Sequence, residues 1–125
     1  VKDIMITGKK LPTININRSI AEAIKVINLK KLGLVVILAK NSIKGIVTDG
    51  DARRGIKFYS KDEKISKFMS SKPMTVEENI SASKALAIMN EKKITSLLVV
   101  SSNKSMSKKL KGIVHIHSLL KYGVK

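Results

Sequence analysis

An internal repeat constrains the fold of this 125-residue chain more than any other feature of its sequence. With a shift of 62 positions, residues 19–24 (SIAEAI) align with residues 81–86 (SASKAL). With a shift of 67, the four residues Lys-Gly-Ile-Val at 44–47 align with the same four residues at 111–114. A self-similarity that preserves both apolar and turn positions indicates two copies of one structural unit.

We place the two copies at residues 1–62 and 63–125. The second shift is longer than the first because the second copy has extra residues in the polar stretch Ser101–Lys109, which we expect to be a surface loop. A copy of about 60 residues buries too little apolar surface to be stable alone. We therefore expect one module in which the copies pack about a pseudo-twofold axis, with equivalent clefts between them.

Each copy has the pattern β-α-β-β-α, which predicts an α+β fold. Ser19 and Glu22 have the spacing of a capping box, and the apolar residues behind them recur at helical spacing until Gly33, which we expect to end the helix as its C′ residue. The other predicted elements of the first copy are strands at 13–16, 34–39 and 43–48 and a helix from about residue 51. The second copy predicts a helix after Ser81 and strands at 96–100 and 112–116.

Composition excludes several classes of function. The chain has no cysteine, which removes disulfides, thiol catalysis and thiolate metal sites. It has neither a run of eighteen apolar residues nor the pattern of a secretory signal, so we expect no membrane span and a cytoplasmic location. Because the sequence begins at Val1 and holds no nucleophile–base pair, we expect a non-catalytic piece of a longer protein.

The net charge of +16 raises the question of nucleic-acid binding. Of the 25 basic residues, however, all but Arg18, Arg53 and Arg54 are lysines, and these are scattered along the chain. Specific readers of nucleic acid use arginine forks and stacking aromatic side chains, and aromatic residues make up 3% of this sequence. We favour a lysine-rich solvated surface over a nucleic-acid interface.

The segment Gly45–Asp51 runs from a buried strand into the start of a helix, a junction that favours anion binding. Thr48 would donate its hydroxyl to a phosphate, and Asp51 would accept hydrogen bonds from vicinal ribose hydroxyls. The nearby Arg53 and Arg54 would neutralise the phosphate. The alternative is that an aspartate of this segment only caps the helix, and spacing alone does not decide between the two.

The pattern Gly-hydrophobic-hydrophobic-Thr-x-x-Asp in a tandem repeat resembles the CBS domain pair, or Bateman module, over essentially the whole chain. That family binds adenosine nucleotides and related ligands in clefts between its two motifs and regulates attached enzymes, channels or transporters. The C-terminal CBS pair of bacterial arabinose-5-phosphate isomerases, sugar isomerases of the Kdo pathway, is similar in more detail. The similar segments are Val1–Met5, Leu32–Leu34, Thr48–Arg54, Ile94–Ser96 and His115–His117.

The resemblance assigns Thr48 and Asp51 to phosphate and ribose, and the backbone around Thr13 and Ile14 to the base. In the second copy His115 stands in place of the threonine and Ser118 in place of the aspartate, so one half-site is intact. The residues expected to line the second cleft are Thr95, Ser96, His115, His117 and Ser118.

His115 and His117 are two residues apart on an expected strand and would face the same way, but no third ligand lies nearby and we expect no metal site.

The resemblance thus implies a regulatory module without a cofactor, which senses an adenosine or cytidine nucleotide or a nucleotide-sugar and controls an N-terminal isomerase domain. It also implies a homodimer formed through the CBS pairs. One alternative is an oligomerisation module with unoccupied clefts, and another is a nucleic-acid-binding domain.

Overall fold

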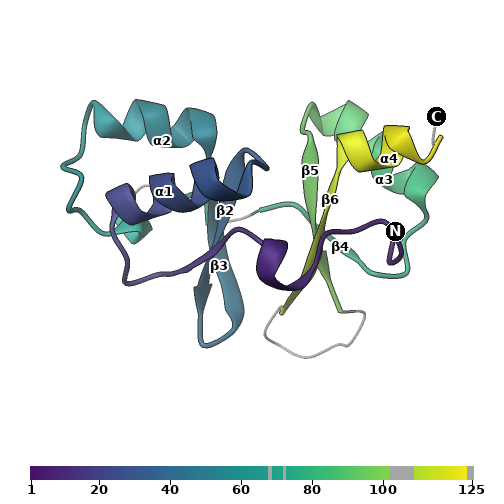
Figure 1. Cartoon of the computed structure of the whole chain (residues 1–125), viewed down its shortest axis with the longest axis horizontal. Coiled ribbons are helices and arrows are strands. Elements are labelled where there is room, and N and C mark those ends of the chain that lie inside the picture. Colours follow the sequence, from purple (N-terminus) through teal and green to yellow (C-terminus); the bar gives the residue numbers. More distant parts are fainter. Residues whose placement is uncertain (68, 72, 102–108, 124–125) are drawn as a thin grey trace. The chain divides into compact units, whose positions relative to one another are not determined.

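The computed structural model describes residues 1–67, 69–71, 73–101 and 109–123, and it confirms the β-α-β-β-α order in both copies (Figure 1). The first copy holds β1 (Thr13–Asn15), α1 (Ile20–Lys30), β2 (Leu34–Ala39), β3 (Ser42–Thr48) and α2 (Asp49–Ile56). The second holds β4 (Thr75–Glu77), α3 (Ala82–Lys92), β5 (Ser96–Val100), β6 (Leu110–His115) and α4 (Ile116–Lys121). Short 3₁₀ helices lie at Gly8–Lys10 and Ile65–Lys67. Most of the expected loop, residues 102–108, lies outside the described residues.

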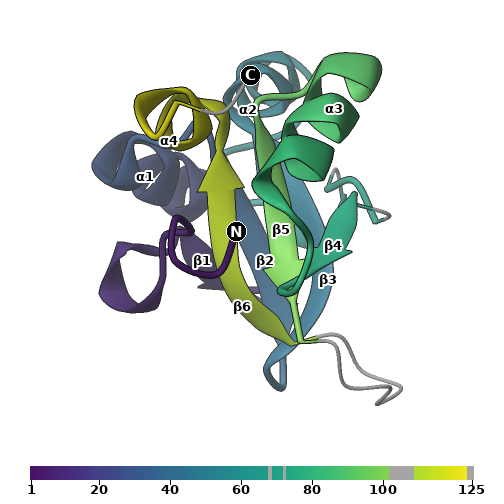
Figure 2. The same cartoon turned by 90° about the vertical axis from the view of Figure 1, so that its right-hand side faces the viewer.

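Each copy forms a three-stranded mixed sheet with the same topology. In the first, β2 is central, parallel to β1 and antiparallel to β3; in the second, β5 is central between β4 and β6 (Figure 2). The antiparallel register shifts between Ile37 and Leu38 in one sheet and between Val99 and Val100 in the other. These positions are equivalent in the repeat, so the duplication extends to an irregularity of the backbone.

The capping box predicted at the start of α1 is confirmed. The backbone N–H of Glu22 donates to Ser19 Oγ at 3.3 Å, and Ser19 N–H donates to Glu22 Oε1 at 3.5 Å. The prediction for the helix end was wrong: α1 stops at Lys30, and Lys31 adopts the left-handed conformation with φ of 59°. Gly33 also has positive φ, but it lies in the link to β2 rather than at the C′ position.

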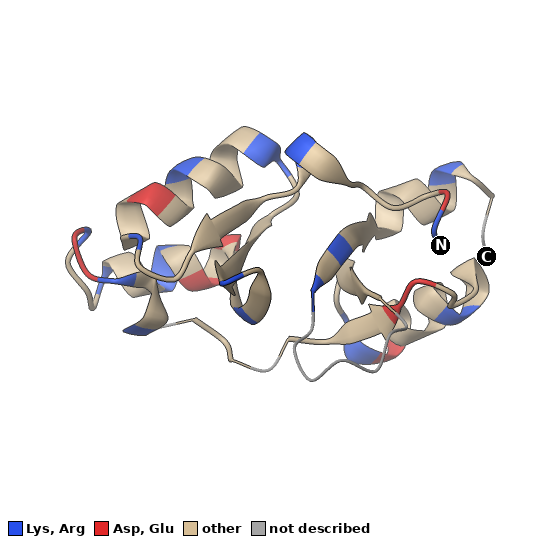
Figure 3. Ribbon diagram, turned by 90° about the horizontal axis from the view of Figure 1, so that it is seen from below, with Lys and Arg blue, Asp and Glu red and all other residues tan. Residues whose placement is uncertain are grey.

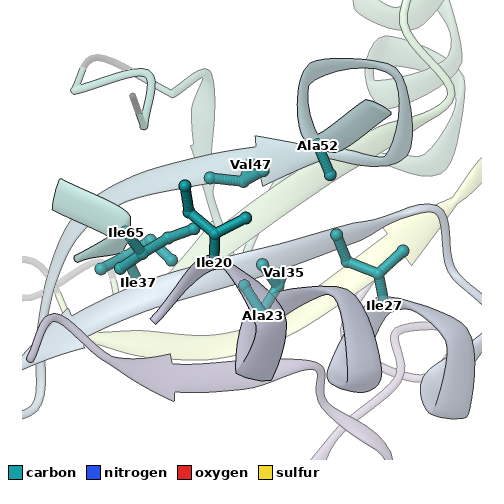
Figure 4. Close-up of a cluster of buried hydrophobic side chains, with 8 residues drawn as sticks. All are labelled: Ile20, Ala23, Ile27, Val35, Ile37, Val47, Ala52 and Ile65. Carbon is teal, nitrogen blue, oxygen red and sulfur yellow. The ribbon is translucent and has the colours of Figure 1, made fainter. Parts of the chain in front are cut away.

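A compact core lies between the helices and one face of the first sheet (Figure 4). Helix α1 contributes Ile20 and two residues at helical spacing, and α2 contributes Ala52, whose side chain points toward the same cluster. Burying one such Ile or Val side chain stabilises the fold by roughly 1.5–3 kcal/mol. The full cluster is Ile20, Ala23, Ile27, Val35, Ile37, Val47, Ala52 and Ile65, and the second copy has a matching one: Val76, Ala85, Leu86, Met89, Leu97, Val99, Val114 and Leu119.

The segment preceding each copy pairs with the last strand of the opposite copy. The chain forms two compact units, one made of Pro12–Pro73 and the other of Val1–Leu11 together with Met74–Lys125. In the first unit Ile46 and Ser70 exchange two backbone hydrogen bonds, each 2.9 Å long. In the second, Ile6 and Ile113 do the same at 2.8 and 3.0 Å. The expected boundary between residues 62 and 63 stays a prediction about the repeat, because the compact units divide the chain elsewhere.

None of the helices in the described ranges has the length and apolar character that a membrane span requires.

Candidate functional site

Thr48 and Asp51 form a reciprocal cap at the junction of β3 and α2. The backbone N–H of Asp51 donates to Thr48 Oγ1 at 3.1 Å, and Thr48 N–H donates to Asp51 Oδ2 at 3.2 Å. Helix α2 therefore begins at Asp49, two residues before the predicted start, because Thr48 itself is the N-cap. Asp51 thus takes part in the cap, although Thr48 and not an aspartate is the N-cap residue, and both residues remain partly exposed at the helix start.

The arginines of α2 pair with aspartates of the same helix. Arg54 donates to Asp51 Oδ1 at 2.5 Å, and Arg53 pairs with Asp49. Partial burial raises the pKa of the Asp51 carboxyl. The hydrogen bonds from Thr48 and the charge and hydrogen bond of Arg54 outweigh that effect and hold this pKa below its usual value. Asp51 is thus a carboxylate with both oxygens engaged.

The residues expected to bind the ligand line two separate hollows in this unit. One, of about 210 Å³, is lined by Asp51, Arg54, Gly55, Phe58 and Tyr59. The other, of about 370 Å³, is lined by Thr13, Ile14, Asn15, Leu38, Lys40 and Asn41. Strand β2 separates β1 from β3, so Thr13 and Ile14 lie at least about 10 Å from Thr48, two strand spacings across the sheet. Thr13 and Ile14 therefore share a sheet with Thr48 but line a different hollow from Asp51.

Phe58 and Tyr59, which follow the end of α2, were not among the predicted site residues. Phe58 is 81% exposed and Tyr59 is 38% exposed, and both line the hollow beside Asp51. A signal was present, because the chain has only two Phe and two Tyr and two of these four stand side by side here. Exposed aromatic side chains next to a charged pair provide a surface on which a flat ligand can stack.

The equivalent junction of the second copy is capped by a histidine. His117 N–H donates to His115 Nδ1 at 3.1 Å, and the two rings meet edge-on with centroids 4.7 Å apart. The strand prediction was wrong here, because β6 ends at His115 and His117 lies in the first turn of α4. Burial, with a smaller contribution from His117, lowers the pKa of His115.

The remaining residues expected in the second cleft lie around that junction. Ser96 is the register partner of His115, and the carbonyl of Thr95 accepts a hydrogen bond from Ile116 N–H at 2.8 Å. Ser118 occupies the helix position that Asp51 has in the first copy. The hydroxyl of Ser96 is buried and has no hydrogen-bond partner among the described residues. The junction is preserved in the second copy, but its carboxylate is replaced by a neutral hydroxyl.

Within the described residues, no three His, Asp or Glu side chains gather where they could hold a metal ion. Figure 3 shows Lys and Arg distributed over helices and connecting segments of both units. Each of the three arginines pairs with an acidic residue three or four positions away in the sequence, since Arg18 also pairs with Glu22 at 3.3 Å. No arginine fork is therefore presented unpaired in the described structure.

The sequence model of the CBS domain matches residues 1–57 and 65–125. Arabinose 5-phosphate isomerase KdsD of Yersinia pestis is 40% identical over 129 aligned positions, which cover 99% of this chain and 37% of that protein. An uncharacterized protein of Rickettsia prowazekii is 35% identical over 125 positions, which cover 99% of this chain and 38% of that protein. The chain thus spans less than two-fifths of the length of these curated relatives.

Solved structures share the same fold at lower sequence identity. A CBS domain pair in complex with 5′-methylthioadenosine and S-adenosyl-L-methionine superposes with a TM-score of 0.81 at 22% identity, covering 98% of this chain and 93% of that one. The protein CBSX2 in complex with AMP gives the same TM-score, identity and coverage. These likenesses confirm the predicted fold class of tandem β-α-β-β-α repeats.

Proposed function

The chain belongs to the CBS domain family, and we propose that it is the ligand-binding regulatory module of a longer protein. The observation that carries the proposal is the junction of β3 and α2, where Thr48, Asp51 and Arg54 bring together a hydroxyl, a carboxylate and a guanidinium at the start of a helix. These groups complement a phosphorylated sugar, because the hydroxyl and the guanidinium bind phosphate and the carboxylate binds vicinal hydroxyls.

The ligand we propose is an adenosine or cytidine nucleotide, or a nucleotide-sugar. Its phosphate would contact Thr48 with Arg53 and Arg54, its ribose would contact Asp51, and its base would reach the backbone of β1 near Thr13 and Ile14. Solved relatives in complex with AMP and with adenosine derivatives support the nucleotide class. Of the two strand-to-helix junctions, the one at Thr48 has a carboxylate at the third helical position and the one at His115 does not. We therefore expect one strong binding site per chain, with the junction at His115 empty or binding more weakly.

The enzyme that this module would control is an arabinose-5-phosphate isomerase of the Kdo pathway, with its catalytic domain N-terminal to the present sequence and the whole protein in the cytoplasm. The 40% identity to the Yersinia pestis isomerase supports this assignment. A regulatory role for the module means that the nucleotide changes the isomerase rate of the full-length protein without being consumed.

Isothermal titration with AMP, CMP and a CMP-sugar tests the binding site. We expect saturable binding of at least one of these ligands and a loss of roughly tenfold or more in affinity for Asp51→Asn, because a charge-assisted hydrogen bond is lost. Asp49→Asn is the matched control: it removes a carboxylate from the same turn but leaves the Thr48–Asp51 cap intact, so its affinity should stay near that of the wild type. Equal losses in the two variants would overturn the assignment of Asp51.

A second candidate function is an oligomerisation platform, which would also provide the homodimer that we propose. Large apolar side chains are exposed near the ends of helices: Leu29, Ile56 and Phe58 in one unit and Leu120 and Tyr122 in the other. Sedimentation separates this function from ligand sensing. A dimer that forms without ligand, together with no thermal shift from any nucleotide, would favour the platform.

A further inference from the structure

Both carboxylate oxygens of Asp51 already have partners inside the protein. Oδ2 accepts the Thr48 N–H at 3.2 Å, and Oδ1 accepts the Arg54 guanidinium at 2.5 Å. A carboxylate that clamps two vicinal hydroxyls offers an oxygen to each of them. Each oxygen has two lone pairs, so a hydroxyl can bind Oδ2 beside the Thr48 N–H, whereas at Oδ1 it meets the charged and stronger partner Arg54. A ribose at this site therefore competes with Arg54 for the outer oxygen of Asp51.

The pair between Asp51 and Arg54 is suited to exchange. The Arg54 side chain is 70% exposed and that of Asp51 is 33% exposed, and ion pairs in water-accessible positions contribute little net free energy. Both residues line the hollow of about 210 Å³ that ends at Phe58 and Tyr59, which leaves the guanidinium space to move. Arg54 can leave Asp51 without disturbing the cap, because Thr48 holds the other oxygen.

From this competition we infer that Arg54 makes the site selective for phosphorylated ligands. A phosphate draws the guanidinium away from Asp51 and so frees the carboxylate for the sugar hydroxyls. When a nucleotide binds, Arg54 exchanges its charge-assisted hydrogen bond to Asp51 for one to the phosphate. The sugar hydroxyls can then donate hydrogen bonds to the carboxylate of Asp51. A nucleoside has no anion to offer, so its neutral hydroxyls must displace the guanidinium at a net cost. The inference rests on the proposed function and adds the residue that distinguishes nucleotide from nucleoside.

Arg53 provides a matched comparison on the same helix. It carries the same charge and is similarly exposed, but it pairs with Asp49, which has no place in the proposed sugar clamp. Removing Arg53 lowers the positive potential near a phosphate without releasing Asp51. The two arginines therefore separate a general charge effect from an exchange at the carboxylate.

The experiment is isothermal titration of adenosine and of AMP into the wild type, Arg54→Met and Arg53→Met. For Arg54→Met we expect adenosine to bind about twofold more tightly, since an exposed ion pair no longer competes. We expect AMP to bind at least roughly tenfold more weakly, since its phosphate loses a charged partner. In Arg53→Met, AMP affinity should also fall, since Arg53 would contact the phosphate too, but adenosine affinity should not change, because Asp51 keeps its ion pair with Arg54. Arg54→Gln, with a shorter, uncharged polar side chain, should show the same opposite changes for the two ligands as Arg54→Met.

The outcomes separate this inference from the proposed function. If the wild type binds neither AMP nor any other nucleotide, the proposed function fails and the inference fails with it. If the wild type binds AMP through Asp51, but Arg54→Met and Arg54→Gln weaken both ligands by one factor or leave both unchanged, Arg54 is not the selective residue and only the inference is overturned. Opposite changes for the two ligands support the exchange, and melting temperatures near that of the wild type show that the variants are folded.

Discussion

Gly45 lies so close to the backbone of Ser70 that a Cβ atom on the glycine would stand 2.4 Å from the Ser70 carbonyl oxygen. The contact arises because Ile46, next to this glycine, exchanges two backbone hydrogen bonds with Ser70. The repeat reproduces it: a Cβ on Gly112 would stand 2.8 Å from the carbonyl oxygen of Ile6. The glycine of each Lys-Gly-Ile-Val segment is therefore needed for close approach of the lead-in segment to the last strand of the sheet.

We expect Gly45→Ala to lower the free energy of unfolding by about 1–3 kcal/mol, because the methyl group would collide with backbone that cannot move without breaking a strand pair. Gly112→Ala should behave in the same way. Urea denaturation measures both changes.

Gly50→Ala is the control for this prediction. Its added Cβ would lie 3.4 Å from the flexible end of the Arg54 side chain, inside α2. Replacing a helical glycine by alanine should raise stability by roughly 0.5–1 kcal/mol. If Gly45→Ala were as stable as the wild type, the close pairing of Ser70 with β3 would be wrong.

The lowered pKa of Asp51 leads to an expected acid dependence of stability. A carboxyl group whose pKa is lower in the folded state than in the unfolded state stabilises the fold above its unfolded pKa. That stabilisation is lost as the pH falls from about 4 through the folded pKa. We expect the wild type to lose more stability than Asp51→Asn over this range, as measured by urea denaturation.

Asp49→Asn serves as the control in acid, since it preserves the cap between Thr48 and Asp51. The acid dependence that Asp51→Asn loses should remain in Asp49→Asn. Parallel curves for the wild type and Asp51→Asn below pH 4 would show that the cap contributes no pH-dependent stability.

Local patterns predicted most of the fold, because the elements are set by short-range chemistry. The Ser19–Glu22 cap and the strand Leu34–Ala39 are found where the sequence places them. The end of α1 was mispredicted because glycine is the usual left-handed residue, whereas here Lys31 and its counterpart Lys93 adopt that conformation. When a residue other than glycine adopts the left-handed conformation, no pattern in a single sequence identifies it.

The candidate site was predicted in part. Thr48, Asp51 and the two arginines were identified from their spacing, but the spacing could not show that each arginine pairs with an aspartate of its own helix. The exchange of lead-in segments between copies was also missed. It depends on pairing between residues far apart in sequence, such as Ile6 with Ile113. The periodicity of apolar residues predicts only local helices and strands.

The first turn of α4 contains no acidic residue, in contrast to α2 with Asp49 and Asp51. Ser118 is at the third helical position, from which a carboxylate reaches back to the N–H of the capping residue. We expect Ser118→Asp to raise the free energy of unfolding by about 0.3–1 kcal/mol, because a negative charge at a helix start is favourable. Ser118→Asn is the uncharged control and should gain less. A loss of stability in Ser118→Asp would contradict the equivalence of the two junctions.

His115 gives the chain an expected pH dependence near neutrality. Its Nδ1 accepts the His117 N–H, which only a deprotonated nitrogen can do, and burial lowers its pKa below the ordinary value. A histidine with a lowered folded-state pKa contributes full stability above its unfolded pKa, about 6.5, and loses that stability as the pH falls through the folded pKa. We expect the wild type to become less stable between pH 7 and pH 5, whereas His115→Asn, which caps without titrating, should change less. His117→Gln keeps the backbone donor and should retain most of the dependence. Equal losses in the wild type and His115→Asn would show that another group causes the effect.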